Sequence, residues 1–282
     1  MDGSQIALVT DSTADIPEYL VDKYNIHVVP NILILNGQSH DDGVDITREE
    51  FYNSLPGMKI QPTTSTASSG TYEELYTRLL SSGAEYIISL HAASSLSGIY
   101  NAARLAAESF KDRIYVFDSE QVTLGLGFQV LAVAEAISKG TTLEKISELI
   151  QNIRPRARVY AMLDTLEYVR RSGRVSWARA RLGNLLNFKP FVELIEGKVL
   201  NLGETRTRHR GIDRLKELLF NLGALENLAI LHTNAESDAR QFWAEVKDHF
   251  QPSIEPLIVN VTTIIGVHIG PNGLGFAAII KS

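Results

Sequence analysis

Short apolar segments alternate with helix-like segments through the first half of the chain, and no other feature of the sequence constrains the fold as strongly. The apolar segments lie at residues 6–10, 26–35, 86–90 and 113–118, and the longest of them is expected to form one long strand. Two parallel neighbouring strands need a crossover connection, which is usually a helix. The spacing therefore predicts an α/β protein whose N-terminal part is a doubly wound parallel sheet.

A second set of elements begins partway along the chain. The apolar segment at 157–163 starts this set, and residues 189–204 have the pattern of a β-hairpin. A chain of 282 residues is long enough for two domains of ordinary size. The sequence therefore predicts two α/β domains, at residues 1–155 and 156–282.

Several classes of chemistry are disfavoured by what the sequence lacks. The chain contains no cysteine, so disulfides and thiolate chemistry are excluded. No apolar run reaches the roughly 20 residues that a membrane-spanning helix needs, and the N-terminal residues lack a signal-peptide pattern. No Walker loop, G-x-G-x-x-G fingerprint or H-E-x-x-H metal motif occurs. We therefore expect a cytoplasmic protein with no metal, no organic cofactor and no stable membrane insertion.

Charge is distributed unevenly along the chain. Residues 1–153 carry 9 lysines and arginines against 20 acidic residues, whereas residues 154–181 carry eight arginines against two acidic residues. The planar guanidinium of arginine suits phosphate and carboxylate groups, so the arginine-rich stretch is either an anion-facing surface or a solvated helix face. Nucleic acid is not expected as a partner, because the acidic first half would repel its backbone.

Three segments rich in serine and threonine stand where strands of the expected sheet end, at residues 10–15, 63–70 and 94–98. In doubly wound sheets, ligands bind in the crevice beyond the carboxyl ends of the strands. The segments offer hydroxyl and N–H donors without lysine or arginine, which suits one carboxylate better than a triphosphate. Ser97 can instead be the N-cap of the following helix. Both interpretations stay open.

Two histidines are candidates for a polar role. His268 lies in the glycine-rich stretch at 266–275, where it is expected on a loop, either facing a partner or in a structural turn. His91 directly precedes the serines at 94–98 and is its main competitor. A serine hydrolase is a weaker alternative, because the G-x-S-x-G motif is absent.

Eight segments, taken together and in order, resemble the DegV family. They cover nearly the whole chain and read LVTDSTADIP, TTSTASSGTYEEL, SSLSGIYNAARLAA, VFDSEQVTLGLGFQVL, LDTLEYVRRSGRVS, LLNFKPFVEL, ETRTRHR and VHIGPNGLG. The resemblance implies two α/β domains that hold a long-chain fatty acid. It also implies a partner, a bacterial fatty acid kinase that phosphorylates the presented carboxylate to an acyl phosphate for phospholipid synthesis. Catalysis is then expected from the kinase and not from this chain.

The resemblance also implies roles for individual residues. The fatty acid carboxylate is expected to bind to four side chains, those of Thr64, Ser65, Ser97 and His268. Three arginines are expected to face the kinase and its nucleotide: Arg171, Arg174 and Arg206. Ile99 departs from the family pattern, in which a threonine is usual at this position, and removes one hydroxyl donor.

Two alternatives to the carrier function are left open. The chain could be a stand-alone enzyme that processes a carboxylate or ester with Ser97 or Ser65 and His268 as its chemical groups. It could also be a lipid-binding sensor that has no kinase partner.

Overall fold

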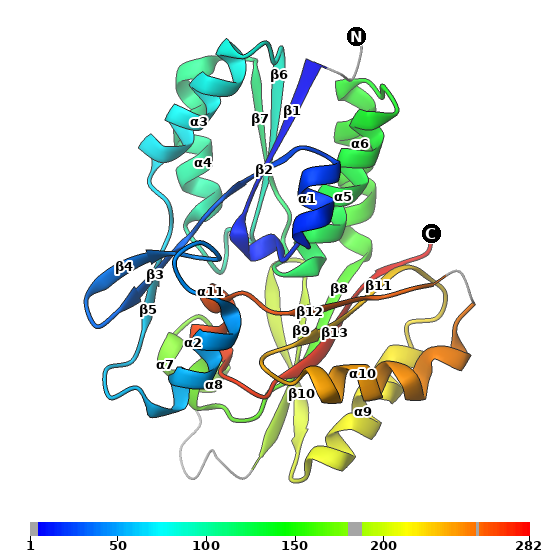
Figure 1. Ribbon diagram of the computed structural model, residues 1–282. Helices are drawn as coiled ribbons and strands as arrows, with labels where there is room; N and C mark the ends of the chain where they lie inside the picture. Colours follow the sequence, from blue (N-terminus) through cyan, green and yellow to red (C-terminus); the bar gives the residue numbers. More distant parts are fainter. Residues whose placement is uncertain (1–4, 180–187, 252–253) are drawn as a thin grey trace.

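The computed structural model describes residues 5–179, 188–251 and 254–282. Four strands form a parallel sheet in the upper part of Figure 1. In spatial order they are β2 (Ile26–Val29), β1 (Ile6–Asp11), β6 (Tyr86–His91) and β7 (Ile114–Asp118). Helices α3 (Ser69–Ser81) and α4 (Ile99–Ala107) cover one face, and α1 (Glu18–Lys23), α5 (Leu124–Ser138) and α6 (Leu143–Ile153) cover the other. The predicted doubly wound parallel sheet is confirmed.

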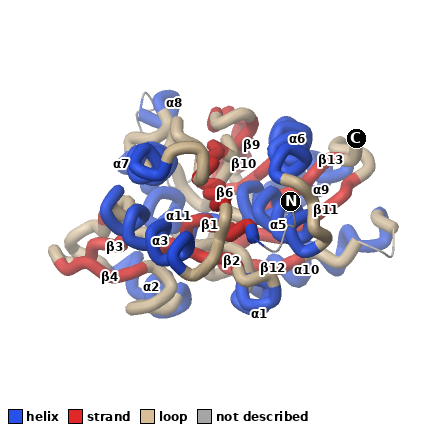
Figure 2. Tube along the Cα trace, turned by 90° about the horizontal axis from the view of Figure 1, so that it is seen from above, coloured by secondary structure: helices blue, strands red, loops and turns tan. Residues whose placement is uncertain are grey.

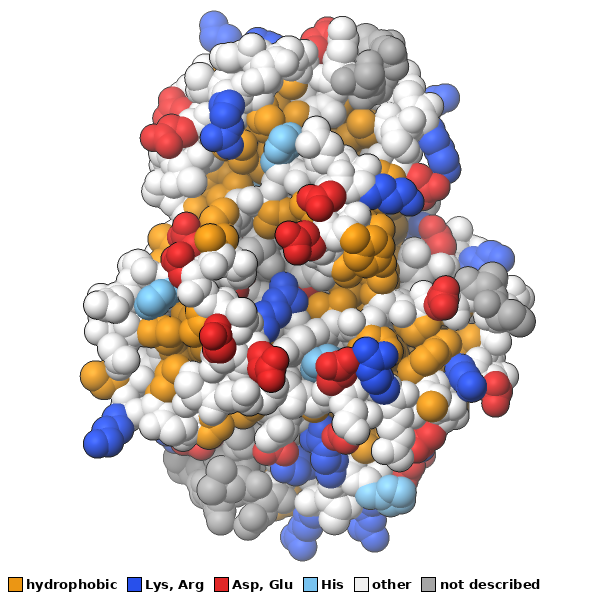
Figure 3. Space-filling view, viewed as in Figure 1, with side chains coloured by type: hydrophobic (Ala, Val, Ile, Leu, Met, Phe, Trp, Pro, Cys, Tyr) orange, Lys and Arg blue, Asp and Glu red, His pale blue; other side chains and the backbone are white. Residues whose placement is uncertain are grey.

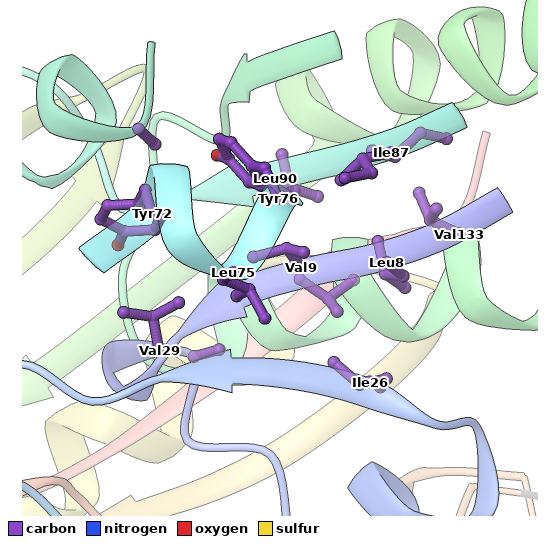
Figure 4. Packing of buried hydrophobic residues seen from close by; sticks show 14 of the residues in the cluster. Leu8, Val9, Ile26, Val29, Tyr72, Leu75, Tyr76, Ile87, Leu90 and Val133 are labelled. Carbon is purple, nitrogen blue, oxygen red and sulfur yellow. The ribbon is translucent and has the colours of Figure 1, made fainter. Parts of the chain in front are cut away.

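The parallel sheet is buried because helices cover both of its faces. Its central strands are nearly continuous apolar runs, as is typical of a strand without a solvent-facing side. Leu8, Val9, Ile87 and Leu90 are buried and pack with the rings of α3 and the aliphatic side chains of α5 (Figure 4). This core fixes the carboxyl edge of the sheet, where the hydroxyl-rich segments follow the strands.

The prediction of one long strand at 26–35 is wrong. The chain breaks at Pro30-Asn31, and β3 (Ile32–Leu35) joins a separate antiparallel sheet with β4 (Gln38–Asp41) and β5 (Thr63–Ser65). Proline has no N–H for a strand ladder, so the parallel pairing with β1 ends there. We call residues 31–65 the hairpin segment.

The hairpin segment reaches away from the parallel sheet towards the second half of the chain (Figure 1). Its helix α2 (Arg48–Ser54) begins with a capping box, in which the Thr47 hydroxyl accepts from the Glu50 N–H and the Glu50 carboxylate accepts from the Thr47 N–H. Its apolar side chains pack on Ile264 of α11 (Thr263–Ile269); they are Leu33, Phe51, Tyr52 and Leu55. The segment therefore joins the two halves of the molecule.

The second sheet has six strands and is antiparallel except between its last pair. In spatial order the strands are β10 (Lys198–Thr205), β9 (Lys189–Ile195), β8 (Ala157–Met162), β13 (Leu274–Ile280), β11 (Leu225–His232) and β12 (Leu257–Asn260). The predicted hairpin at 189–204 is confirmed as β9 and β10. The remaining helices are α7 (Glu167–Ser172), α8 (Ser176–Arg179), α9 (Arg208–Phe220) and α10 (Glu236–Val246).

Side chains of the second sheet alternate between two environments. On one face, Tyr160 and Met162 pack with residues of α9 and α10. On the other face, Val159 and Ala161 point towards the first half of the chain, where α5 and the hydroxyl-rich loops lie. In Figure 1 this sheet lies below the parallel one, and in Figure 2, seen from above, the strands of the two sheets overlap.

Charged side chains of both signs are interspersed on the face of the molecule in Figure 3, with apolar patches between them. No described helix combines the length and the apolar character needed to cross a membrane. Within the described residues, no group of three or more histidine, aspartate or glutamate side chains is placed to hold a metal ion.

Candidate functional site

A largely apolar cavity lies between the carboxyl edge of the parallel sheet and the second sheet. It encloses about 1220 Å³ of empty space, its open mouth included. Strands β8 and β9 line it with Val159, Ala161, Val192 and Leu194, and α11 lines it with aliphatic side chains. The inward face of the second sheet therefore forms one wall of the cavity.

Four polar side chains from distant parts of the sequence meet at one end of this cavity. They are Thr64 of β5, Ser97 before α4, Arg174 after α7 and His268 of α11. The Thr64 hydroxyl and His268 Nε2 are 3.0 Å apart and form a hydrogen bond between residues 204 positions apart in the sequence. We call these four residues the polar end of the cavity.

His268 does not lie in a loop, contrary to the expectation from its glycine-rich surroundings. It occupies the last turn of α11, which begins after Thr262, whose hydroxyl accepts a hydrogen bond from the Ile264 N–H. The two glycines that suggested a loop have other roles. Gly266 lies against the ring of Tyr52, and Gly270 ends the helix at φ 80° against Tyr168.

Buried polar contacts from the first half of the chain hold the start of α11. The Asp42 carboxylate accepts hydrogen bonds from the hydroxyls of Thr262, at 2.5 Å, and Thr263, at 2.7 Å. Asp15 Oδ1 accepts from the Thr262 N–H at 2.9 Å and pairs with Arg48 Nη1 at 3.0 Å. Burial nevertheless raises the pKa of Asp15 to about 6, against the opposing effect of Arg48. These contacts fix the helix that carries His268.

The environment of His268 keeps its imidazole neutral. Burial, and then the positive charge of Arg174, lower the pKa of His268 from 6.5 to about 4. Its Nε2 is bonded to Thr64, whereas its buried Nδ1 has no hydrogen-bond partner. A neutral imidazole with one nitrogen available can donate to an acceptor at the polar end of the cavity. With so low a pKa, it is a weak general base at neutral pH.

Protein stability should report this low pKa. Between pH 6.5 and about 4 the unfolded chain takes up a proton at His268 while the folded chain does not, so the stabilisation by the neutral ring is complete above pH 6.5 and is lost as pH falls towards 4. Asp15 has the opposite effect on stability: because its pKa is raised in the folded protein, its contribution grows as pH falls from about 6 to 3.8. We therefore expect the stability difference between the native protein and His268→Gln to shrink as pH falls through this window, measured by urea unfolding.

An NMR titration gives the independent check of the same prediction. The His268 ring should titrate near pH 4 in the native protein, and its pKa should rise when Arg174→Gln removes the neighbouring charge. A ring that titrates near 6.5 in both proteins would contradict the buried, neutral state.

The three predicted hydroxyl residues have different surroundings. Thr64 and Ser97 line the cavity, whereas Ser65 is exposed, donates to the Thr66 carbonyl at 3.3 Å, and lines only an adjoining polar pocket. Ser97 is not the N-cap of α4. That position belongs to Gly98, and the Ser97 hydroxyl accepts from the Ile99 N–H only at a long 3.4 Å.

The three predicted arginines are not brought together. Arg174 follows Gly173, whose φ of 69° ends α7, and its guanidinium donates to the Ser172 carbonyl at 2.9 Å. Arg171 is exposed and forms an ion pair with Glu167 on the same helix. Arg206 is exposed, and its guanidinium lies 5.7 Å from the centre of the Phe188 ring. Neither Arg171 nor Arg206 lines the cavity.

His91 forms a hydrogen-bonded series of the serine–histidine–aspartate type, but in the core. Its Nδ1 is 3.0 Å from Asp11 Oδ2, and its Nε2 is 2.6 Å from the Ser89 hydroxyl. All three side chains are fully buried, so no substrate reaches Ser89. Burial alone would raise the pKa of Asp11, but its hydrogen bonds with His91 and Thr13 outweigh burial and lower that pKa. This group stabilises the parallel sheet.

The hydrolase alternative finds no support in the geometry of the polar end. His268 forms a hydrogen bond with Thr64 and not with Ser97 or Ser65. No carboxylate of the described chain accepts a hydrogen bond from its Nδ1. A base that must activate a serine needs a hydrogen bond to that serine and a group that orients the base.

Two features of the site were not found by sequence reasoning. The aliphatic residues Ile264, Ile265 and Ile269 of α11 line the cavity. The sequence did not indicate them, because a helix of seven residues is hard to recognise among glycines. Asn31 lines the adjoining polar pocket. The signal for Asn31 was available, since a polar residue after proline inside an apolar run indicates a turn.

Comparisons with known proteins agree with this architecture. Residues 5–281 match a family model described as "Uncharacterised protein, DegV family". Protein DegV of Bacillus subtilis is 32% identical over 284 residues, which cover 98% of this chain and 99% of that protein. A solved structure described as "Fatty Acid Binding of a DegV family Protein from Thermus thermophilus" superimposes with a TM-score of 0.90 at 32% identity, over 98% of this chain and 100% of that one. The structure of Bacillus subtilis DegV, described as a fatty acid binding protein, superimposes with a TM-score of 0.88 at 31% identity, over 98% of this chain and 99% of that one. The chain belongs to the DegV family.

Proposed function

We propose that this protein binds a long-chain fatty acid in the apolar cavity and presents its carboxylate to a partner kinase in the cytoplasm, which converts it to an acyl phosphate. The relatives of known structure from Thermus thermophilus and Bacillus subtilis, which share about a third of their residues with this chain, are described as fatty acid binding. Presentation to a kinase is the more specific part of the proposal, and its support is the family resemblance and the exposed charge of Arg174.

One observation carries the proposal: four polar side chains gather at one end of an apolar cavity. Of the other polar side chains in the lining, Thr123 has a buried hydroxyl without a hydrogen-bond partner, and several already have partners within the protein. Thr13 donates to Asp11, Thr233 Oγ1 accepts from the Gly273 N–H at 2.7 Å, and His232 Nδ1 accepts from the Ala235 N–H at 3.2 Å. A molecule with a long apolar tail and one carboxylate head has this distribution of polarity.

The polar end supplies hydrogen bonds to that carboxylate and one positive charge on its exposed side. The Ser97 hydroxyl is one neutral donor, and the hydrogen-bonded Thr64–His268 pair supplies a second one, either the Thr64 hydroxyl or His268 Nδ1, according to the tautomer of the neutral imidazole. Arg174 has no carboxylate partner within the described chain, so its charge is available to a ligand or a partner. Arg174 is exposed, whereas the other groups are partly buried. Arg174 is therefore the member best placed to meet the phosphate groups of the nucleotide in a docked kinase.

The test separates binding from presentation. Mass spectrometry should find a long-chain fatty acid in an organic extract of the purified protein. Ser97→Ala should then weaken fatty acid binding about tenfold, because it removes a hydrogen bond to a charged group. Arg174→Ala should lower the rate of acyl phosphate formation by the kinase far more than it lowers affinity.

Each part of the proposal can fail separately. A purified protein that neither carries nor binds a fatty acid would contradict the binding function. If the protein binds a fatty acid tightly but no fatty acid kinase of the same cell phosphorylates that acid, the presentation function is contradicted and the lipid-sensor alternative is supported. Equal losses of affinity and rate in Arg174→Ala would place that residue in the pocket and not at a partner.

A further inference from the structure

A second, polar pocket adjoins the polar end of the cavity, and neither the apolar tail nor the carboxylate needs it. It encloses about 700 Å³ of empty space, open solvent included. The two spaces adjoin, since six residues line both of them: Thr64, Leu96, Ser97, Ile99, Arg174 and Ile264. The pocket therefore lies at the head of any ligand whose tail fills the cavity.

The Asn31 side chain brings an unsatisfied acceptor to this pocket. It is only 1% exposed, and its amide nitrogen donates to Asp11 Oδ1 at 3.2 Å and to the Ser12 hydroxyl at 3.3 Å. The opposite assignment of the amide would place its oxygen against the Asp11 carboxylate, so the orientation is fixed by chemistry. The amide oxygen is left without a hydrogen-bond partner, in a residue that lines the pocket. A buried acceptor of this kind requires a donor.

Gly98 keeps the pocket open. Its backbone, at φ −76° and ψ −2°, is one that any residue adopts, and a Cβ there would meet only Thr66 Cγ2, at an ordinary 3.7 Å. Glycine is therefore not required by the local fold, although it is unfavourable at a helix end compared with a side-chain cap. The space that a side chain would occupy belongs to the pocket.

The charges of the pocket lining select the chemistry of its occupant. Arg174 is the single charged residue among the described residues that line it, and the others that are polar bear hydroxyls or amides. An ammonium group would meet no carboxylate among the described lining residues, and an anion paired with Arg174 would have no proton to donate to the Asn31 oxygen. A neutral hydroxyl group can donate to Asn31 and accept from the serine and threonine hydroxyls.

We propose that this pocket binds a hydroxyl group that the ligand carries within a few bonds of its carboxyl carbon, and that Asn31 Oδ1 accepts its hydrogen bond. This inference rests on the proposed fatty acid binding and makes the substrate class narrower. Two sources share the chemistry: a fatty acid hydroxylated at C2 or C3, and a glycerol monoester.

Affinity measurements on the delipidated full-length protein test the inference. The ligands are hexadecanoic acid, 2-hydroxyhexadecanoic acid, 3-hydroxyhexadecanoic acid and 1-monohexadecanoylglycerol. We expect at least one hydroxyl-bearing ligand to bind about fivefold more tightly than hexadecanoic acid, as one satisfied hydrogen bond predicts. Whether the acid or the ester gains identifies the source.

Two variants locate the effect. Asn31→Leu removes the acceptor but also the contacts with Asp11 and Ser12, so Gly98→Leu, which fills the pocket from the other side, is the main variant. Gly70→Leu on the exposed start of α3 is its matched control. The readout is the ratio of dissociation constants for the hydroxylated and plain ligands within each protein, so an overall change in affinity cancels. The ratio should fall to about one in Gly98→Leu and persist in Gly70→Leu.

The outcomes are distinct. Tighter binding of a hydroxylated ligand, lost in Gly98→Leu, supports the inference. Equal binding of plain and hydroxylated ligands by the native protein overturns it and assigns the Asn31 oxygen to water, with fatty acid binding intact. If Gly98→Leu still binds the hydroxylated ligand more tightly than the plain acid, the hydroxyl group does not lie in this pocket and the inference is overturned. Failure of hexadecanoic acid itself to bind contradicts the proposed function, as none of the other outcomes does.

Discussion

Ala161→Phe should lower the affinity for hexadecanoic acid about 100-fold without destabilising the protein. Ala161, the next-to-last residue of β8, lines the cavity, so a phenyl ring there takes space that the acyl chain would use. Displacing about four methylene groups, at about 0.8 kcal/mol each, amounts to about 3 kcal/mol of binding free energy. The same ring fills empty apolar space in the free protein, so its thermal midpoint should be equal or higher. Calorimetric titration and a thermal melt measure the two effects.

Ligand length provides the control for this prediction. An acid about four carbons shorter should lose little affinity for Ala161→Phe, because its chain ends before the blocked part of the cavity. Val44→Phe, at a position that is 72% exposed, adds the same ring outside the cavity and should change neither affinity nor stability. Unchanged binding of hexadecanoic acid by Ala161→Phe would show that the tail lies elsewhere, and a lowered midpoint would show that the cavity has no room for a ring.

The parallel sheet could be predicted from the sequence because its signals are local. Runs such as residues 86–90 are apolar apart from Ser89, and each is followed by a helix of ordinary length. The break at Pro30-Asn31 was missed although proline marks it, because the apolar residues on both sides share one strand-like pattern. What decides the path of the chain there is the pairing of β3 with β5, a contact between residues about 30 positions apart that no local pattern contains.

The candidate site could be predicted less completely, for the same reason. Sequence reasoning alone indicated the hydroxyl-rich strand ends, and the resemblance added the roles of His268 and Arg174. Neither indicated that Thr64 and His268 form a hydrogen bond, because their proximity depends on the hairpin segment that packs on α11. The glycines around His268 indicated a loop because their true role, close packing against the Tyr52 and Tyr168 rings, is a property of the tertiary structure.

That packing leads to the second large effect: Gly266→Ala should destabilise the protein by about 1–3 kcal/mol and weaken ligand binding with it. A Cβ at Gly266 would lie 2.7 Å from Tyr52 Cζ and closer still to the phenolic oxygen. The ring has no free space to move into, since Tyr52 is 1% exposed, donates to the Val261 carbonyl at 2.9 Å and packs edge-on against Phe51. Overpacking of a rigid core has a free-energy cost in this range. Since α11 carries His268, a shift of the helix away from Tyr52 should disturb the hydrogen bond between His268 and Thr64.

A double-mutant cycle separates this cause from a general loss of stability. Tyr52→Leu alone should be destabilising, because it leaves a cavity and removes the hydrogen bond to Val261. Combined with Gly266→Ala, it provides room for the new methyl group, so the double variant should be more stable than the sum of the two single effects. Gly70→Ala, at an exposed helical glycine whose Cβ would have an ordinary 3.5 Å contact, should leave stability equal or slightly higher. Strictly additive losses in the cycle, measured by urea unfolding, would mean that Tyr52 does not set the position of α11, and His268 would then owe its place beside Thr64 to the contacts of Asp42 and Asp15 alone.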